Sequence, residues 1–221
     1  VIITTGTFLR GIIHQGQNSW SAGRINSKPS IKLASFFEEN KFKTLRLKTG
    51  TPPRLVANSI DFSKCKKQYG DKNPETFSFL NDSINIKQIC CHITHTNQKT
   101  HEIVKNNIKK SPMFNGQMKS KGPRYCPSLE DKVYRFEDKQ SHQIFLEPET
   151  LDQKIIYPNG ISTSLPLEIQ KNLLESIVGL ENVEVDQFGY SIEYDCIDSS
   201  ELKHSLETRK VSGLFLAGQI N

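Results

Sequence analysis

The stretch VIITTGT, residues 1–7, has the pattern of a buried β-strand that runs into a turn containing glycine. Near the other end of the chain, LFLAGQ at 214–219 has the same form. Turns of this kind let a backbone approach a ligand closely, although they are common in α/β proteins. Strand and helix patterns alternate next to both stretches, so the sequence predicts an α/β fold at its two ends.

Inward from the first stretch, the sequence predicts a helix and a second strand. Ser30 suits the helix start, because its side-chain oxygen would accept a backbone N–H of the first turn. The helix is expected to end near Asn40, and an apolar–polar alternation predicts a strand at 44–48. KTGTPPR at 48–54 combines two cations and two hydroxyls around a glycine. It is either a phosphate-holding loop or a rigid joint between domains.

Residues 55–149 have a different texture, with many loops and short elements. The patterns predict a strand at 89–94, a helix from Asn97 to about Lys109, and a hairpin of strands at 133–136 and 143–146. We interpret this part as a subdomain inserted into the first. The predicted division of the chain is 1–54, an insert at 55–150, and a return to the first domain at 151–221.

Regular structure is expected again in the last third of the chain. Pro166 suits the first turn of a helix whose apolar stripe is Ile169, Leu173 and Ile177. Gly179 fits the position beyond the end of this helix. Strands are predicted at 182–185, 190–194 and 214–216.

The composition permits a hydrophobic core but not a membrane span. Hydrophobic residues make up 35% of the chain, the mean hydropathy is −0.51, and no apolar run approaches the roughly 18–20 residues of a membrane helix. No signal peptide opens the chain, and both ends are expected to be cut from a larger protein. The net charge is +5, and residues 103–129 hold six Lys or Arg and no acid. This run is either a solvated surface or a patch that faces phosphates.

The five cysteines have irregular spacing: Cys65, Cys90, Cys91, Cys126 and Cys196. An odd number without a pattern predicts no disulfide framework and favours a reducing compartment. The stretch CCHITH at 90–95, with His101 beyond it, contains metal-ligand residue types. Neighbouring residues of a strand point to opposite faces, however, and no second cysteine pair completes a tetrahedron. We therefore predict no metal site.

Cys126 stands between two prolines in the stretch GPRYCPSLEDKVYRF. Arg124 and Lys132 would favour its thiolate, because nearby positive charge stabilises the anion, and the thiolate is the nucleophilic form. The two acidic residues before Lys132 act in the opposite direction or pair with those cations. The stretch is thus either a site with a reactive thiol or a structural turn pinned by arginine–carboxylate pairs.

Several long motifs occur together and in order: TTGTFLRG at 4–11, RLKTGTPPR at 46–54, GPRYCPSLEDKVYRF at 122–136, YPNGISTSLP at 157–166 and GLFLAGQIN at 213–221. Together they closely resemble the MnmG (GidA) family of tRNA-modifying flavoproteins over essentially the whole chain. The resemblance implies an α/β, glutathione-reductase-like FAD-binding fold, present in part, with an inserted NAD(H)-binding α+β subdomain. The FAD-binding parts would be 1–54 and 151–221, the insert 55–150, and the chain a central fragment of such a protein.

The same resemblance implies a function. The enzyme would be FAD-dependent, cytoplasmic and not bound to a membrane, and would add a (carboxymethyl)aminomethyl group to C5 of the wobble uridine (U34) of tRNA. Methylenetetrahydrofolate would be the carbon donor and NADH the reductant. Implied partners are tRNA and the GTPase MnmE in a heterotetramer, with the enzyme as a homodimer and the fragment alone inactive. Two alternatives stay open: a related folate- and FAD-dependent tRNA uridine methyltransferase, and a non-catalytic scaffold that binds tRNA or MnmE.

Residue assignments also follow from the resemblance. Cys126 matches one of two cysteines thought to take part in catalysis. FAD contacts are expected at Thr4, Thr5, Gly6, Ser30 and Gln219. NAD contacts are expected along one continuous segment: Gly122, Pro123, Arg124, Tyr125, Cys126, Pro127, Ser128, Leu129, Glu130, Asp131, Lys132, Val133, Tyr134, Arg135 and Phe136.

Overall fold

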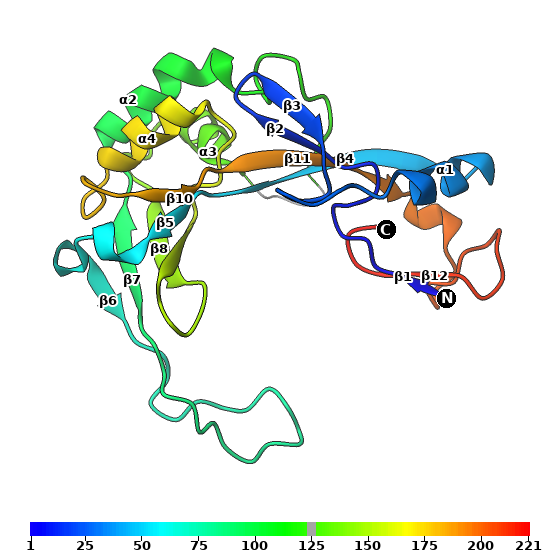
Figure 1. Ribbon diagram of the computed structural model, residues 1–221, viewed down its shortest axis with the longest axis horizontal. Coiled ribbons are helices and arrows are strands. Elements are labelled where there is room, and N and C mark those ends of the chain that lie inside the picture. Colours follow the sequence, from blue (N-terminus) through cyan, green and yellow to red (C-terminus); the bar gives the residue numbers. More distant parts are fainter. Residues whose placement is uncertain (123–126) are drawn as a thin grey trace.

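The computed structural model describes residues 1–122 and 127–221. A long antiparallel pair of strands, β4 (Thr44–Thr51) and β11 (Tyr190–Ile197), runs between two lobes (Figure 1). With β2 (Ile12–Gln15) and β3 (Asn18–Ser21), the pair forms a four-stranded sheet in the order β3-β2-β11-β4. The predicted strands at 44–48 and 190–194 are therefore confirmed, and both are longer than predicted.

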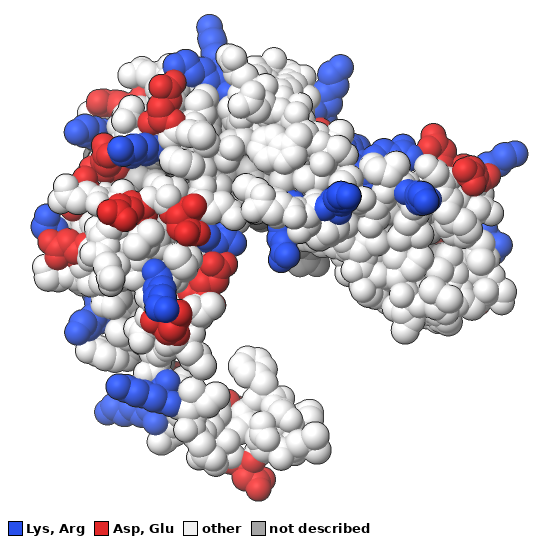
Figure 2. Space-filling model, in the orientation of Figure 1, with Lys and Arg blue, Asp and Glu red and all other residues white. Residues whose placement is uncertain are grey.

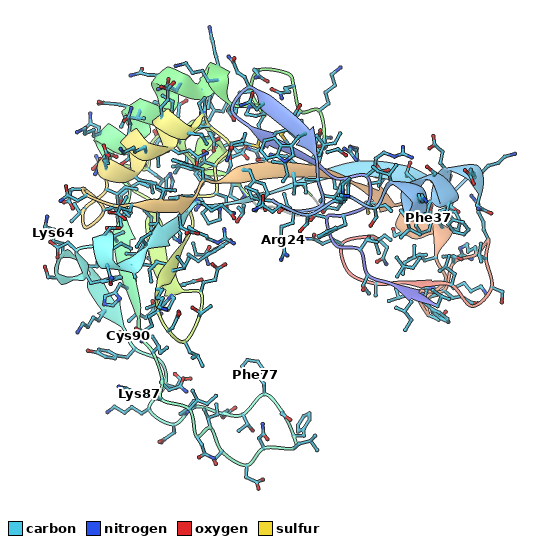
Figure 3. The ribbon with its side chains drawn as sticks, viewed as in Figure 1. Arg24, Phe37, Lys64, Phe77, Lys87 and Cys90 are labelled. Atoms are coloured by element: carbon cyan, nitrogen blue, oxygen red, sulfur yellow. The ribbon has the colours of Figure 1, made fainter. Side chains whose placement is uncertain are left out.

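The first lobe contains both ends of the described chain (Figure 1). Its elements are β1 (Ile2–Ile3), α1 (Ile31–Glu39), the 3-10 turn η4 (Ser199–Glu201) and β12 (Phe215–Leu216). β1 and β12 pair in parallel, in the register Ile2 to Phe215. Phe37, on α1, is completely buried in the core of this lobe, and Figure 3 labels it there.

The second lobe is built on a six-stranded sheet in which every neighbouring pair is antiparallel. The strand order is β10-β5-β9-β8-β7-β6. The strands are β5 (Arg54–Val56), β6 (Lys66–Gln68), β7 (Cys91–His95), β8 (Gln143–Pro148), β9 (Ile155–Asn159) and β10 (Val185–Gln187).

Helices gather on one side of this sheet (Figure 1). They are α2 (Gln98–Asn107), α3 (Leu129–Arg135) and α4 (Leu167–Glu175). The same lobe contains the 3-10 turns η1 (Ala57–Ser59), η2 (Phe62–Lys64) and η3 (Ile108–Lys110). α2 contacts both α3 and α4. Completely buried side chains such as Leu129, Leu146 and Leu174 join the helices to the sheet in one core.

Local signals explain two of these helices. Asn97 caps α2 in a capping box with Thr100, as predicted from its position before the helical pattern. The predicted apolar stripe of α4 is buried at Ile169, Leu173 and Ile177. Gly179 beyond the helix has φ +89°, and an added Cβ would lie 2.7 Å from Cys65 Sγ, so this position requires glycine.

Three local predictions are wrong. The strand predicted at 182–185 lies further along the chain, as β10 at Val185–Gln187. Ser30 precedes α1 as expected, but its side chain makes no capping hydrogen bond. Residues 133–136 are not a strand, because a capping box between Ser128 and Asp131 starts α3 just before them. The partner of β8 in a hairpin is therefore β9.

The core of the second lobe continues beyond residue 150. β9, α4 and β10 all come from the part assigned to the returning first domain, yet they join the sheet or the core of the insert. The six-stranded sheet is thus built from both sides of that boundary. The division at 54 and 150 stays a prediction for the complete protein.

An arm, residues 69–90, connects β6 to β7 and extends away from the second lobe (Figure 1). Phe77 and Phe79 near its tip are completely exposed. Figure 3 shows Phe77 far from the point where the arm joins the lobe near Cys90. Most of the arm tip carries no charge in the view of Figure 2.

Candidate functional site

The parallel pairing of β1 and β12 sets two turns side by side. Ile3 O accepts a hydrogen bond of 3.1 Å from Ala217 N, so the turn with Thr4, Thr5 and Gly6 neighbours the turn with Gln219. In sheets of parallel strands, ligands bind outside the carboxyl ends of the strands. The structure thus brings four of the predicted FAD residues together at one sheet end, and their contacts with FAD stay predictions.

Space is open in front of both turns. Gly6 has φ +56° and Gly218 has φ +86°, a backbone conformation that glycine adopts without strain. A Cβ added at either position would meet nothing within 4 Å. Neither glycine is therefore required by packing inside the chain, and both turns leave room for a bound molecule.

Two polar atoms in this region are buried without a partner among the described residues. They are Thr5 Oγ1, on the first turn, and Asn221 Oδ1, beyond the second. Buried polar atoms in proteins almost always have a hydrogen-bond partner. Both atoms are closed to solvent in this structure, so the open space at Gly6 and Gly218, and not these two atoms, is the feature that suits a bound cofactor.

Ser30 joins this region through its backbone. Ser30 N donates to Phe8 O at 2.8 Å, and Phe8 N donates to Thr5 O at 3.0 Å. The start of α1 is thereby tied to the segment that follows the first turn. The backbone contacts, and not the predicted side-chain cap, fix Ser30 near the other predicted FAD residues.

The predicted NAD segment is described only in part. Outside the described residues lie four of its members, Pro123, Arg124, Tyr125 and Cys126. The predicted catalytic thiol is that of Cys126, so the structure does not describe it. Pro127 and Ser128 lead into α3, and Phe136 follows its last residue. The described part of the segment is therefore mostly one short helix.

An open cavity of about 550 Å³ lies beside α3. Its lining combines cations from three elements, Lys48, Lys121 and Arg135, with the carboxylate of Asp131 and the apolar side chains Met113, Phe114 and Met118. Asp131 lies 3.7 Å from both Lys48 Nζ and Arg135 Nε. Apolar side chains beside several cations suit a ligand with a flat ring and phosphates.

Two cations that the sequence assigned to candidate sites, Lys132 and Arg54, contact protein groups elsewhere. Lys132 Nζ donates to Gly160 O at 2.7 Å. Arg54 contacts Glu149 at 3.0 Å and stacks over Tyr157, so it does not share an anion site with Lys48. The stretch 48–51 is part of β4 and pairs with β11, so KTGTPPR is not one phosphate-holding loop.

Sequence reasoning missed a polar network next to the cavity, in which His14 and Glu193 are buried. Glu193 on β11 accepts from Ser120 Oγ at 2.5 Å and contacts His14 Nε2 at 3.0 Å, while Gln117 Nε2 lies 3.3 Å from His14 Nδ1. Burial alone would raise the pKa of Glu193, but the hydrogen bonds from Ser120 and His14 outweigh it and the pKa is lowered. The network ties the loop before Gly122 to the central sheet, and its residues are too far apart in sequence to form a motif.

His101, one of the metal-ligand residue types noted in the sequence, has structural partners. His101 Nε2 lies 2.8 Å from Thr96 Oγ1, and the ring of His101 stacks near that of His142. Within residues 1–122 and 127–221, no three His, Cys, Asp or Glu residues gather as metal ligands. The same residues contain no helix that is long and apolar enough to cross a membrane.

The basic run at 103–129 has exposed lysines, but acidic residues lie on the same lobe. Its five described lysines are exposed: Lys105, Lys109, Lys110, Lys119 and Lys121. Figure 2 shows Lys and Arg interspersed with Asp and Glu over the visible face of the second lobe. Lys121 is also part of the cavity lining.

Comparison with known proteins gives one family over the whole chain. The family model described as glucose inhibited division protein A (GIDA) matches residues 1–221. The chain is 50% identical over 221 residues to the tRNA uridine 5-carboxymethylaminomethyl modification enzyme MnmG of Helicobacter pylori (strain Shi470), covering 100% of this chain and 36% of that protein.

Two solved structures of Aquifex aeolicus GidA have the same fold. The form I crystal structure matches with a TM-score of 0.91 and 46% identity over 100% of this chain and 38% of that one. The form II structure matches with a TM-score of 0.89 and 44% identity, over 100% and 35%. The chain spans little more than a third of the length of these relatives. Family model, sequence identity and fold agree, and the chain belongs to the glucose inhibited division protein A (GidA) family.

Proposed function

We propose that the complete protein is an FAD-dependent enzyme that modifies the wobble uridine of tRNA at C5. The observation that carries the proposal is the parallel pairing of β1 and β12, which sets the turns at 4–6 and 217–219 side by side. The H. pylori relative, 50% identical, is named as a tRNA uridine 5-carboxymethylaminomethyl modification enzyme. Addition of a (carboxymethyl)aminomethyl group is therefore the reaction that we propose.

FAD would be held by the first lobe. Gly218, with open space in front of it, would let the backbone approach the cofactor, and Thr4, Thr5 and Gly6 would contact it from the neighbouring turn. Ser30 and Gln219 would complete the contacts. Bound FAD would supply the electron transfer of the reaction.

NADH would bind in the cavity beside α3. Lys48, Lys121 and Arg135 would hold its phosphates, since charge-assisted hydrogen bonds to phosphate are strong. Phe114 and its apolar neighbours would contact a ring of the dinucleotide. Asp131 would orient Lys48 and Arg135, which both lie 3.7 Å from it.

Cys126 would be the catalytic thiol, with methylenetetrahydrofolate as the carbon donor. The target base would leave the anticodon stack, as in other enzymes that act on bases. We propose further that the enzyme works in the cytoplasm as a homodimer and associates with the GTPase MnmE. The exposed lysines at 105–121 would attract the tRNA backbone, so tRNA binding should weaken with added salt.

The test compares two glycines of the complete protein. Gly218 and Gly213 flank β12, both have positive φ, and a Cβ at either position meets nothing within 4 Å. Gly218→Ala and Gly213→Ala should therefore cost similar backbone strain. We expect Gly218→Ala to lower the flavin content, read from the flavin absorbance, at least tenfold, while Gly213→Ala leaves it unchanged. Equal flavin content in the two variants would overturn the proposed cofactor site.

The two alternatives predict different observations. A uridine methyltransferase would leave a methyl group on the nucleoside, which mass spectrometry separates from an aminomethyl product. A non-catalytic scaffold would purify without flavin. The 50% identity to an MnmG enzyme over the whole chain favours the aminomethyl product.

A further inference from the structure

Glu130 is a carboxyl group that the fold buries completely. It is the second residue of α3. Three donors converge on its Oε1: Ser111 Oγ at 3.2 Å, Thr163 Oγ1 at 3.0 Å and Ser164 N at 3.2 Å. Its Oε2 is buried and has no hydrogen-bond partner among the described residues. Among the described residues, Oε1 is therefore satisfied by three donors and Oε2 has no hydrogen-bond partner.

This distribution of donors suits a neutral carboxylic acid. A carboxylate shares its negative charge between both oxygens, and a buried half-charge without a donor is costly. In the acid, Oε1 is a carbonyl oxygen that accepts from the three donors, and Oε2 carries the proton. The three donors are themselves neutral groups. Burial raises the pKa of Glu130 and outweighs the hydrogen bonds, which act in the opposite direction.

The donors belong to segments that lie far apart in sequence. Ser111 follows η3, whereas Thr163 and Ser164 lie between β9 and α4. Leu129 N, next to Glu130, adds a bond of 2.7 Å to Ser162 O. Glu130 is thus the point at which the start of α3 is joined to both neighbouring segments.

The same segments carry walls of the cavity. Met113 and Phe114 follow Ser111, and Phe114 N donates to Ser111 O at 3.0 Å. Asp131 and Arg135 lie on α3. A change in the bonds at Glu130 would therefore move two sides of the cavity relative to each other.

We propose that Glu130 acts as an uncharged carboxylic acid and is a positioning residue for the cavity, because it fixes α3 to the segments at Ser111 and Ser164. The role in NADH binding rests on the proposed function. The protonation state and the fixing of α3 do not. Each part is tested by its own measurement on the complete protein.

Infrared spectroscopy tests the protonation state. Glu130→Gln keeps the acceptor oxygen and removes the acid, and Glu168→Gln is the matched control because Glu168 is exposed on α4. We expect the C=O stretching band of a protonated carboxyl in the wild type and in Glu168→Gln at neutral pH, and its loss in Glu130→Gln. A wild type in which that band does not differ from Glu130→Gln would overturn the proposal.

Hydrogen–deuterium exchange tests the positioning. Glu130→Ala removes the acceptor and leaves three buried donors without a partner, whereas Glu130→Gln retains it. We expect exchange at 111–114 and in α3 to rise at least tenfold in Glu130→Ala and to stay within about twofold of wild type in Glu130→Gln. If Glu130→Ala does not fold, Glu130→Asp replaces it in the test. The shorter side chain moves the carboxyl oxygen away from the three donors. Unchanged hydrogen exchange in the Glu130→Ala or Glu130→Asp variant would contradict the proposal. Raised exchange in the Glu130→Gln variant would contradict it as well.

NADH titration of the same variants links the residue to the cavity. Glu130→Gln should keep the dissociation constant within about twofold, while Glu130→Ala weakens binding at least tenfold. A large loss in Glu130→Gln would show that the charge is needed and would overturn the uncharged role. If the wild type binds no NADH while exchange and infrared results are as expected, the proposed NADH site fails and the positioning role of Glu130 stands.

Discussion

The first lobe holds the two ends of the chain in a two-stranded parallel sheet, whereas the second lobe closes six antiparallel strands over a continuous core. Among the described residues, seventeen buried apolar side chains form the core of the second lobe and nine that of the first. The first lobe leaves open glycine turns at its sheet end, and the second has a cavity beside α3. Buried polar atoms without a partner among the described residues occur in both lobes. The comparison shows that the larger apolar core lies in the second lobe, whereas the first lobe joins segments far apart in sequence at an open sheet end.

The largest expected effect separates chemistry from cofactor binding. Cys126→Ser in the complete protein should lower tRNA modification by at least roughly a hundredfold, because loss of a nucleophile costs orders of magnitude. Flavin content should not change, since the proposed flavin contacts lie in the first lobe. Product analysis by mass spectrometry and flavin absorbance measure the two effects. Cys90→Ser is the control, and wild-type modification by Cys126→Ser would remove the thiol from the mechanism.

A core substitution tests the apolar core assigned to the second lobe. Leu146 on β8 is completely buried, so Leu146→Ala should lower the free energy of unfolding by about 2–5 kcal/mol. Leu151, between β8 and β9, is 70% exposed, and Leu151→Ala should change it by less than about 0.5 kcal/mol. Thermal unfolding of the complete protein measures both. Equal melting temperatures for the two variants would contradict the assigned core.

The two helix caps offer a smaller and more direct comparison. Asn97 caps α2 with its side chain, so Asn97→Ala should cost about 1–2 kcal/mol of stability. Ser30 precedes α1 without a side-chain cap, and Ser30→Ala should cost almost nothing. If Ser30 contacts FAD, however, Ser30→Ala should weaken flavin retention while Asn97→Ala does not. Stability and flavin content together decide between a structural and a ligand-binding serine.

The smallest expected effect is a pH dependence confined to the second lobe. Burial lowers the pKa of His101 and His142, so both imidazoles are neutral in the folded state at neutral pH. Their contribution to stability is complete above the unfolded value of about 6.5 and is lost as pH falls below it toward the folded pKa. The melting temperature of His142→Gln should therefore fall less than that of wild type over this window. Parallel curves for the two proteins would exclude this contribution.

Local patterns in the sequence predicted many of the elements. Asn97 before a helical pattern and the stripe ending at Ile177 located α2 and α4, because capping and apolar spacing act within one helix turn or two. Residues 133–136 misled because valine, tyrosine and phenylalanine favour strands, whereas the capping box starting at Ser128 fixes a helix. A cap is thus a stronger local constraint here than β-propensity.

The site was harder to predict than the elements. The motifs of the family pointed to Thr5 and Gln219, and the turns that carry them are neighbours in the structure. The contact between Glu193 and His14 joins residues 179 positions apart, and neither residue type is unusual in a strand. Polar networks of this kind depend on sheet register and the path of loops, which no local pattern encodes.

The pairing of β1 with β12 also constrains the order in which the protein can assemble during translation. Ala217 N donates to Ile3 O, 214 positions away, so the two proposed flavin turns can meet only after the residues between them have left the ribosome. At about 5–20 residues per second, that delay is roughly 10–40 s. The antiparallel hairpin of β8 and β9 closes over a much shorter distance and can form earlier. The proposed flavin turns are therefore expected to come together later than the β8–β9 hairpin.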